Sequence, residues 1–211
     1  MDKEIARDIA SQLLKIKAVT LSPKEPFTWA SGIKSPIYTD NRLTIAYPKF
    51  RQTIADDLAV LIKEKYPDVE IIGGVATAGI PHATGVANAL GLPLNYVRPK
   101  KKDHGKKGQI EGRCEANDKV VLIDDLISTG GSILKAVDAV KETGAQVIGT
   151  VAIFSYDLPE SKTNFAQKDL QLFTLTDFPT LIEVAQELDY VEKNDTELLH
   201  EWYKNPEGWC K

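Results

Sequence analysis

The residues best suited to chemistry follow a short apolar run at positions 120–123. Two acidic residues, Asp124 and Asp125, come directly after that run, and a small-residue segment, 128–132, then leads into an amphipathic helical pattern. Backbone N–H groups of such a turn converge on an anion at the N-terminus of the helix, where the helix dipole also favours negative charge. We therefore interpret residues 128–132 as a cradle for a phosphate monoester. The adjacent acids are placed to bind ribose hydroxyls or a magnesium-bound ligand.

A simpler interpretation of the same segment is structural. Ser128 or Thr129 would cap the helix, and Gly130 and Gly131 would form a plain turn. The acid pair directly after a buried strand favours a ligand site instead. Other phosphate-binding motifs are absent, because Gly-x-x-x-x-Gly-Lys-Ser/Thr does not occur and Gly-x-Gly-x-x-Gly follows no predicted strand. The sequence therefore disfavours a nucleoside triphosphatase and a nicotinamide-dependent enzyme.

A second unusual stretch, residues 98–113, is strongly basic. It holds seven lysines and arginines against two acids, whereas the whole chain has 26 basic and 30 acidic residues and a formal charge of −4. A charge run on its own is usually a solvated loop. Beside a phosphate cradle, and with Gly105 and Gly108 to give it mobility, we interpret it as a cationic lid that closes on an anion and excludes water. The acidic remainder argues against a nucleic acid partner.

The elements that must position these residues alternate along the chain. Apolar spacing predicts a helix over residues 2–17 and short strands at 27–29 and 36–39. Further on, it predicts helices at 48–65, 80–90, 131–142, 177–188 and 195–204, and strands at 69–75, 94–98, 119–123, 146–154 and 170–175. Helical crossovers between short apolar strands imply a parallel sheet. The predicted fold class is α/β, an open, twisted, mostly parallel sheet flanked by helices, with a small N-terminal cap or hood.

Length and composition set the outer limits. With 211 residues, 43% of them apolar, we predict one domain over residues 1–211, in which about residues 1–45 form the N-terminal helix and cap and the C-terminus can contribute to that cap. The chain has no apolar stretch of membrane-span length and no secretory signal at its start, so we expect a cytoplasmic protein without a membrane partner. Cys114 and Cys210 lack metal-ligand spacing and are interpreted as reduced thiols. His82 is interpreted as a packing or surface residue.

Four stretches resemble the orotate phosphoribosyltransferases, a group within the type I phosphoribosyltransferase family. Residues 120–132, Val-Val-Leu-Ile-Asp-Asp-Leu-Ile-Ser-Thr-Gly-Gly-Ser, are similar to the family signature for 5-phosphoribosyl 1-pyrophosphate (PRPP). The other three occur in the family's order and spacing: Thr-Trp-Ala-Ser-Gly-Ile-Lys-Ser-Pro at 28–36, Gly-Ile-Pro at 79–81, and Arg-Pro-Lys-Lys-Lys-Asp-His-Gly at 98–105. The resemblance spans about residues 27–153 and implies the type I phosphoribosyltransferase fold.

The resemblance also implies a reaction. The 5-phosphoribosyl group of PRPP would pass to orotate, giving orotidine 5′-monophosphate and pyrophosphate in de novo pyrimidine (UMP) synthesis. Asp124 and Asp125 match acids that contact the ribose hydroxyls and count as catalytic residues, and Ser128 also matches a residue near orotate. The full PRPP-binding loop implied by the match comprises Asp124, Asp125, Leu126, Ile127, Ser128, Thr129, Gly130, Gly131 and Ser132.

The leaving group has its own implied partners. Arg98, Lys102 and His104 match cationic residues that engage the pyrophosphate, and Lys102 is also a catalytic candidate. Residues 76–79 fall where the family has its pyrophosphate-binding turn. The resemblance implies a homodimer in which Lys102 and His104 act in the partner's site. Mg²⁺ is the expected cofactor, arriving mainly through PRPP rather than in a protein metal site, because it prefers phosphates and water to an all-protein cage.

Four positions depart from the pattern of some family members: Ala30, Ala78, Pro99 and Leu158 stand where those members carry lysine or arginine. The sequence thus leaves open how the orotate carboxylate is held. The candidates are backbone N–H groups near residues 31–34 and the side chains of Lys34, Arg42 and Lys100.

Two other functions share the cradle. A PRPP-sensing regulator would not need the set of leaving-group cations, and the chain has no separate DNA-binding segment. A purine phosphoribosyltransferase would differ in the cap, where residues 31–36 resemble the orotate group. Both alternatives are therefore less favoured than the orotate reaction.

Overall fold

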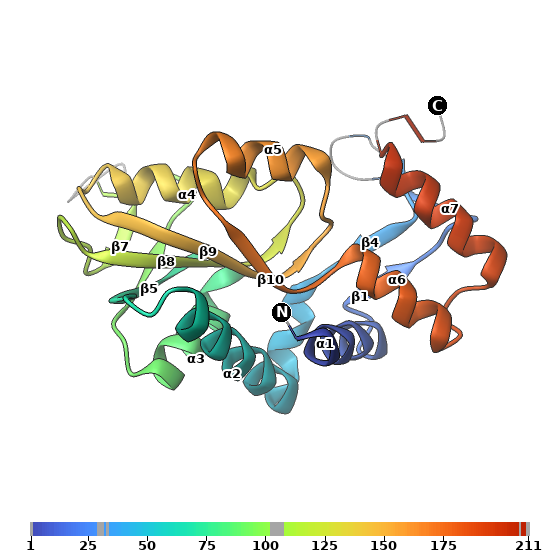
Figure 1. Ribbon diagram of the computed structural model, residues 1–211, viewed down its shortest axis with the longest axis horizontal. Coiled ribbons are helices and arrows are strands. Elements are labelled where there is room, and N and C mark those ends of the chain that lie inside the picture. The colour runs from blue at the N-terminus through green and yellow to red at the C-terminus, as the bar shows by residue number, and fades with distance from the viewer. Residues whose placement is uncertain (1, 29–31, 33, 102–107, 207, 210–211) are drawn as a thin grey trace.

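The computed structural model describes residues 2–28, 32, 34–101, 108–206 and 208–209. Its centre is an open six-stranded sheet with the order β10-β9-β8-β5-β6-β7 (Figure 1). All neighbouring strands are parallel except β6 and β7, which confirms the predicted α/β class. The strands are β5 (Ile71–Val75), β6 (Leu94–Val97), β7 (Ile110–Gly112), β8 (Lys119–Ile127), β9 (Gln146–Ser155) and β10 (Leu172–Asp177).

Strand β8 shows why the sheet is covered on both faces. Val121 and Ile123 belong to the core on one side of the sheet, whereas Val120 and Leu122 belong to the core on the other. Helices α2 (Pro48–Lys65) and α3 (Gly79–Leu90) cover the first face, and α4 (Gly131–Lys141) and α5 (Pro159–Gln167) cover the second (Figure 1). A strand buried on both faces is apolar at every position, which accounts for the continuous apolar run before the acid pair.

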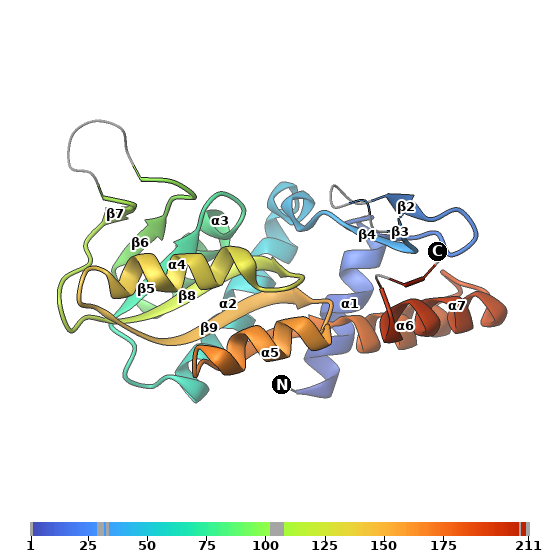
Figure 2. The ribbon, with the colours of Figure 1, turned by 90° about the horizontal axis from the view of Figure 1, so that it is seen from above.

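The N-terminal strands pack against the C-terminal helices. Helix α1 (Lys3–Lys15) precedes two small antiparallel pairs, which are β1 (Val19–Leu21) with β4 (Ile37–Thr39) and β2 (Phe27–Thr28) with β3 (Lys34–Ser35). Helices α6 (Phe178–Glu187) and α7 (Lys193–Lys204) lie beside these strands (Figure 2). Trp202 of α7 is fully buried, and its Nε1 donates to the Lys34 carbonyl at 3.1 Å. The two ends of the chain therefore share one packed unit.

The structure adds elements that the periodicity did not predict. They are β1, β3, the edge strand β7, the 3₁₀ helix η1 (Asn41–Ala46) and helix α5. Only Ser161 and Phe165 of α5 are buried, so its apolar spacing is too sparse to indicate a helix. Across the residues that the structure describes, no helix is both long enough and apolar enough to span a membrane.

The predicted end of the central strand is wrong by four residues. β8 continues from the expected end at position 123 to Ile127, because β9 keeps pairing with it as far as Ile127 opposite Ser155. Asp124 and Asp125 therefore lie within a strand rather than in the loop after it. The backbone of the acid pair is held on one side by this ladder.

Candidate active site

The loops that follow β5 and β8 lie where the strand order of the sheet reverses. β5 connects through α3 to β6 on one side, and its neighbour β8 connects through α4 to β9 on the other. In open parallel sheets the crevice at such a point, at the carboxyl ends of the strands, is the usual ligand site. Residues 76–78 follow β5 there, with a cis peptide bond between Ala76 and Thr77, and residues 128–130 follow β8.

A glycine lets helix α3 approach this crevice closely. A Cβ atom on Gly79, the first residue of α3, would lie 2.4 Å from the Ile123 carbonyl oxygen. No side chain other than hydrogen is compatible with that contact, so the N-terminus of α3 packs directly on the backbone of β8. The Gly-Ile-Pro stretch thus brings residues 76–78 next to the acid pair.

The acid pair is largely removed from water. Asp124 is 6% exposed, and the Asp125 N–H donates to its Oδ1 at 2.9 Å. Burial, with the negative charge of Asp125 added, raises the pKa of Asp124 to about 8. Burial also raises the pKa of Asp125. The charge of Asp125 disfavours ionisation of Asp124, whereas hydrogen bonding with the Asp124 side chain lowers the pKa of Asp125. The pair therefore retains one proton near neutral pH until positive charge or hydroxyl donors arrive.

Asn41 in η1 supports the backbone of the acid pair. β5 pairs with β8 only as far as Ile123, so the Asp125 carbonyl lies beyond its last partner on that side. Asn41 is 1% exposed, and its Nδ2 donates to that carbonyl at 2.7 Å. The Asn41 side chain thereby supplies the hydrogen bond that a neighbouring strand would otherwise give to this carbonyl.

His82 extends this support to helix α3. The Thr44 hydroxyl donates to the Asn41 carbonyl at 2.6 Å, and His82 Nε2 lies 3.2 Å from the same hydroxyl oxygen. Since Thr44 has only one proton to give, Nε2 carries the ring hydrogen of His82. Burial lowers the pKa of His82 to about 4, so the ring is neutral. The interpretation of His82 as a packing residue is confirmed.

The predicted cradle joins β8 to the N-terminus of α4. Its N-cap is Gly130, at a φ of 83°, and within the described part of the chain no side chain caps this helix end. The alternative in which Ser128 or Thr129 caps the helix is therefore wrong. The first-turn N–H groups, which a cap would otherwise occupy, suit an anion.

Helix α5 contacts the cradle from behind. Asn164 Nδ2 donates to the Thr129 carbonyl at 2.9 Å. A Cβ atom on Gly130 would lie 2.6 Å from the Phe165 ring. Neither Asn41 nor Asn164 was predicted as part of the site, because a single asparagine far from a motif carries no recognisable spacing.

The basic segment begins at Arg98, directly after β6. Its backbone N–H donates to the Gln109 carbonyl at 2.8 Å, and Gln109 Nε2 donates back to the Arg98 carbonyl at 2.6 Å. Arg98 Nη1 lies 3.9 Å from Glu111 Oε1. Lys102 and His104 lie outside the described residues, so the structure places Arg98 beside the sheet and says nothing of the other two predicted pyrophosphate ligands.

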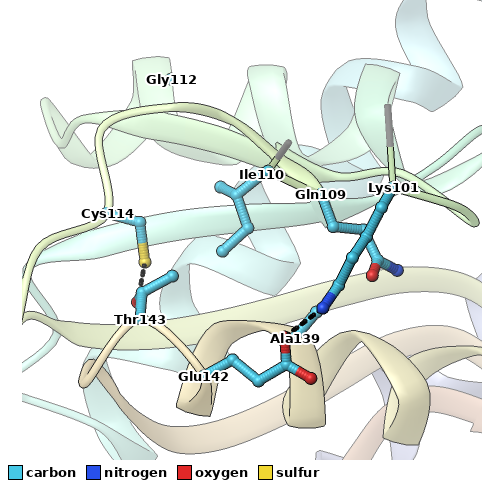
Figure 3. Close-up of a pocket in the computed structure, with 9 residues that line it drawn as sticks. Lys101, Gln109, Ile110, Gly112, Cys114, Ala139, Glu142 and Thr143 are labelled. Atoms are coloured by element: carbon cyan, nitrogen blue, oxygen red, sulfur yellow. Dashed lines mark hydrogen bonds and ion pairs between the residues drawn. The ribbon is translucent and has the colours of Figure 1, made fainter. Parts of the chain in front are cut away.

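A small pocket lies between the base of this segment and the end of α4. Its volume is about 250 Å³. Lys101 Nζ bonds to Glu142 Oε2 at 2.7 Å across it, and Cys114 Sγ lies 3.3 Å from Thr143 Oγ1 (Figure 3). Lys101 is therefore paired with the residue that ends α4.

Two of the three cations proposed for orotate, Lys34 and Arg42, have partners within the cap. Lys34 Nζ donates to Thr28 Oγ1 at 2.7 Å. Arg42 bonds to both carboxylate oxygens of Asp40, at 2.6 and 2.9 Å, and its charge also lowers the pKa of Asp125. Arg42 thus acts electrostatically on the acid pair. Leu158, where some family members have arginine, is 6% exposed and part of the core.

Comparisons with known proteins agree with this geometry. Residues 48–191 match the family model described as a phosphoribosyl transferase domain. The chain is 57% identical over 208 residues to an orotate phosphoribosyltransferase of Enterococcus faecalis, covering 99% of each chain. It is also 57% identical over 206 residues to that of Lactiplantibacillus plantarum, covering 98% of this chain and 97% of the relative. The crystal structure of orotate phosphoribosyltransferase from Aeropyrum pernix is similar with a TM-score of 0.73 and 28% identity, over 87% of this chain and 99% of that one.

Proposed function

The chain belongs to the orotate phosphoribosyltransferase family, and we propose that it carries out the family's reaction in the crevice between β5 and β8. The enzyme transfers the 5-phosphoribosyl group of PRPP to orotate and releases orotidine 5′-monophosphate and pyrophosphate, a step of UMP synthesis. One observation of the structure carries the assignment of the site. The buried acid pair of β8 runs directly into a glycine loop at the N-terminus of α4.

The reaction develops positive charge on the ribose and negative charge on the departing diphosphate. Groups already aimed at those charges lower the barrier, and they act more strongly where water is excluded. Asp124 and Asp125 hold the ribose hydroxyls and face the positive ring, and residues 128–132 hold the 5-phosphate. Ser128, at the start of the loop, also contacts orotate. The Asn41 contact keeps the backbone of Asp125 in place throughout.

The diphosphate is held from the other side of the crevice. Arg98, Lys102 and His104 bind it together with the turn at residues 76–79, and Lys102 stabilises the charge of the leaving group. Magnesium, when bound, neutralises part of the diphosphate charge. Asp124 and Asp125 place two adjacent carboxylates beside the proposed ribose site, and oxygen donors of this kind suit a magnesium ion that arrives with PRPP.

We propose a homodimer in which Lys102 and His104 reach the partner's site. A mixed dimer tests this arrangement. Co-expression of Asp124→Asn with Lys102→Ala chains forms one intact site per dimer if the residues come from different subunits, so activity returns above that of either parent. Activity that stays at the parental level contradicts the shared site.

The expected location is the cytoplasm, with no nucleic acid or membrane partner. Cys114 is a free thiol, as is usual in a reducing compartment. The acidic pI of about 5.5 disfavours a polyanionic partner.

The reaction is tested by mixing the chain with PRPP and Mg²⁺ and following pyrophosphate release. Orotate, adenine, guanine, xanthine and uracil are offered separately, and release with orotate alone is the expected result. Release with a purine would contradict the assigned base. PRPP binding without turnover of any base would identify the PRPP-sensing regulator instead.

A further inference from the structure

Helix α5 presents two consecutive side chains to the phosphate loop. Asn164 is half-buried and donates from Nδ2 to the Thr129 carbonyl at 2.9 Å. Phe165, 4% exposed, lies against Gly130 so closely that a Cβ there would approach its ring to 2.6 Å. α5 therefore contacts two of the three residues, 128–130, that join the strand to the helix.

The contact determines how one peptide group of the loop is oriented. A trans peptide is planar, with its C=O and N–H pointing in opposite directions. Because Asn164 holds the Thr129 carbonyl toward α5, the N–H of Gly130 points away from α5. Among the described residues that N–H donates to no other group.

The loop has few other constraints on this peptide. β8 ends at Ile127 and α4 begins at Gly131, so the peptide between Thr129 and Gly130 belongs to neither ladder. Gly130 sits in the left-handed region, at a φ of 83°, and a glycine there can also rotate to other conformations. A hydrogen-bond donor from outside the loop is therefore needed to keep this peptide group in one orientation.

We propose that Asn164 is a positioning residue for the 5-phosphate of PRPP. It binds the back of the loop and so keeps the Gly130 N–H directed toward the phosphate, without touching the substrate itself. The inference rests on the proposed function, because it takes residues 128–132 as the phosphate cradle. Phe165 assists by packing against Gly130, which prevents the loop from moving toward α5.

The test separates the phosphate from the rest of the substrate. Asn164→Leu keeps the size of the side chain and removes its donor, and Asn164→Ala serves as the second variant where leucine impairs folding. Binding of ribose 5-phosphate reports on the cradle, and the KM values for PRPP and orotate report on the two substrates. Thr150→Val is the matched control, because it removes a comparable bond away from the loop, from Thr150 Oγ1 in β9 to the Gln171 carbonyl just before β10, at 2.8 Å.

Loss of one such hydrogen bond is expected to weaken ribose 5-phosphate binding and raise the KM for PRPP by about tenfold. The KM for orotate and kcat should change little, since the contact is uniform between ground and transition states. The control should match wild type in all four values.

Two results would overturn the inference. One is ribose 5-phosphate binding that is unchanged in both Asn164 variants while wild type binds normally. The other is an equal loss of binding for ribose 5-phosphate and orotate, which would indicate general damage. A wild-type chain that does not bind ribose 5-phosphate would overturn the cradle assignment of the proposed function, and the inference with it.

Discussion

The loop after β8 and the segment after β6 are both proposed to bind anions, yet they are built differently. The β8 loop is held by a side chain from α5, and the end of β8 before it is held by a side chain from η1. The base of the β6 segment is held by the Arg98–Gln109 bonds and by the exposed Lys101–Glu142 pair. The proposed phosphate cradle is thus supported by buried groups, whereas the described base of the cationic segment is held in part by an exposed ion pair.

The largest effect should come from the segment after β6. Lys102→Ala is expected to lower kcat by about 100- to 1,000-fold, because one electrostatic partner of the leaving group is lost. Thermal unfolding should not change, since Lys102 is proposed to act on the diphosphate and not in the core. Steady-state kinetics and a melting curve check both points. Near-normal turnover would remove Lys102 from the mechanism.

In contrast to Lys102, the acid pair should affect folding stability, and it should do so in a way that depends on pH. The pKa of Asp124 is raised in the folded chain to about 8 from 3.8, so between these values the folded state holds a proton that the unfolded state has released. The contribution of Asp124 to the free energy of unfolding therefore falls as pH rises, by at most about 1.4 kcal/mol per pH unit.

Denaturant unfolding of the ligand-free chain between pH 5 and 8 measures this dependence. Asp124→Asn should flatten it, because the amide does not titrate, and should be relatively more stable than wild type at pH 8. Parallel curves for the two proteins would contradict the shifted pKa.

Packing of the cradle gives an intermediate effect. Gly130→Ala is expected to cost about 1–3 kcal/mol of folding stability and to weaken PRPP binding, because the left-handed backbone and the Phe165 ring both oppose a Cβ. Gly91→Ala is the matched control. Gly91 also has a positive φ, 66°, but nothing lies within 4 Å of a Cβ there. Equal losses in the two variants would show that the contact with α5 is unimportant.

The smallest effect should come from the base of the cationic segment. Lys101→Ala and Glu142→Gln remove an ion pair whose side chains are 57% and 61% exposed. Such pairs contribute less than about 1 kcal/mol, so stability and turnover should stay near wild type. A double-mutant cycle measures the coupling. A large loss of turnover in either variant would mean that the Lys101–Glu142 pair matters for the reaction as much as the contacts of the β8 loop do.

The order of the main sheet elements could be predicted because each is marked by its own apolar period. α2, α3 and α4 lie within a few residues of their predicted bounds. The failures have physical causes. β7 has only three residues inside a basic stretch, and β8 runs on through two acids because the ladder with β9 outweighs their poor strand propensity.

The sequence by itself predicted a phosphate cradle beside an acid pair, because the acids and the glycine loop are contiguous and their local spacing indicates an anion site at the start of a helix. Only the tertiary structure decided how that loop is held. Asn41 and Asn164 are 84 and 35 residues away from the carbonyls they bind. A single hydrogen bond from a distant side chain leaves no periodic trace in a sequence, so these contacts emerge only when η1 and α5 pack against β8.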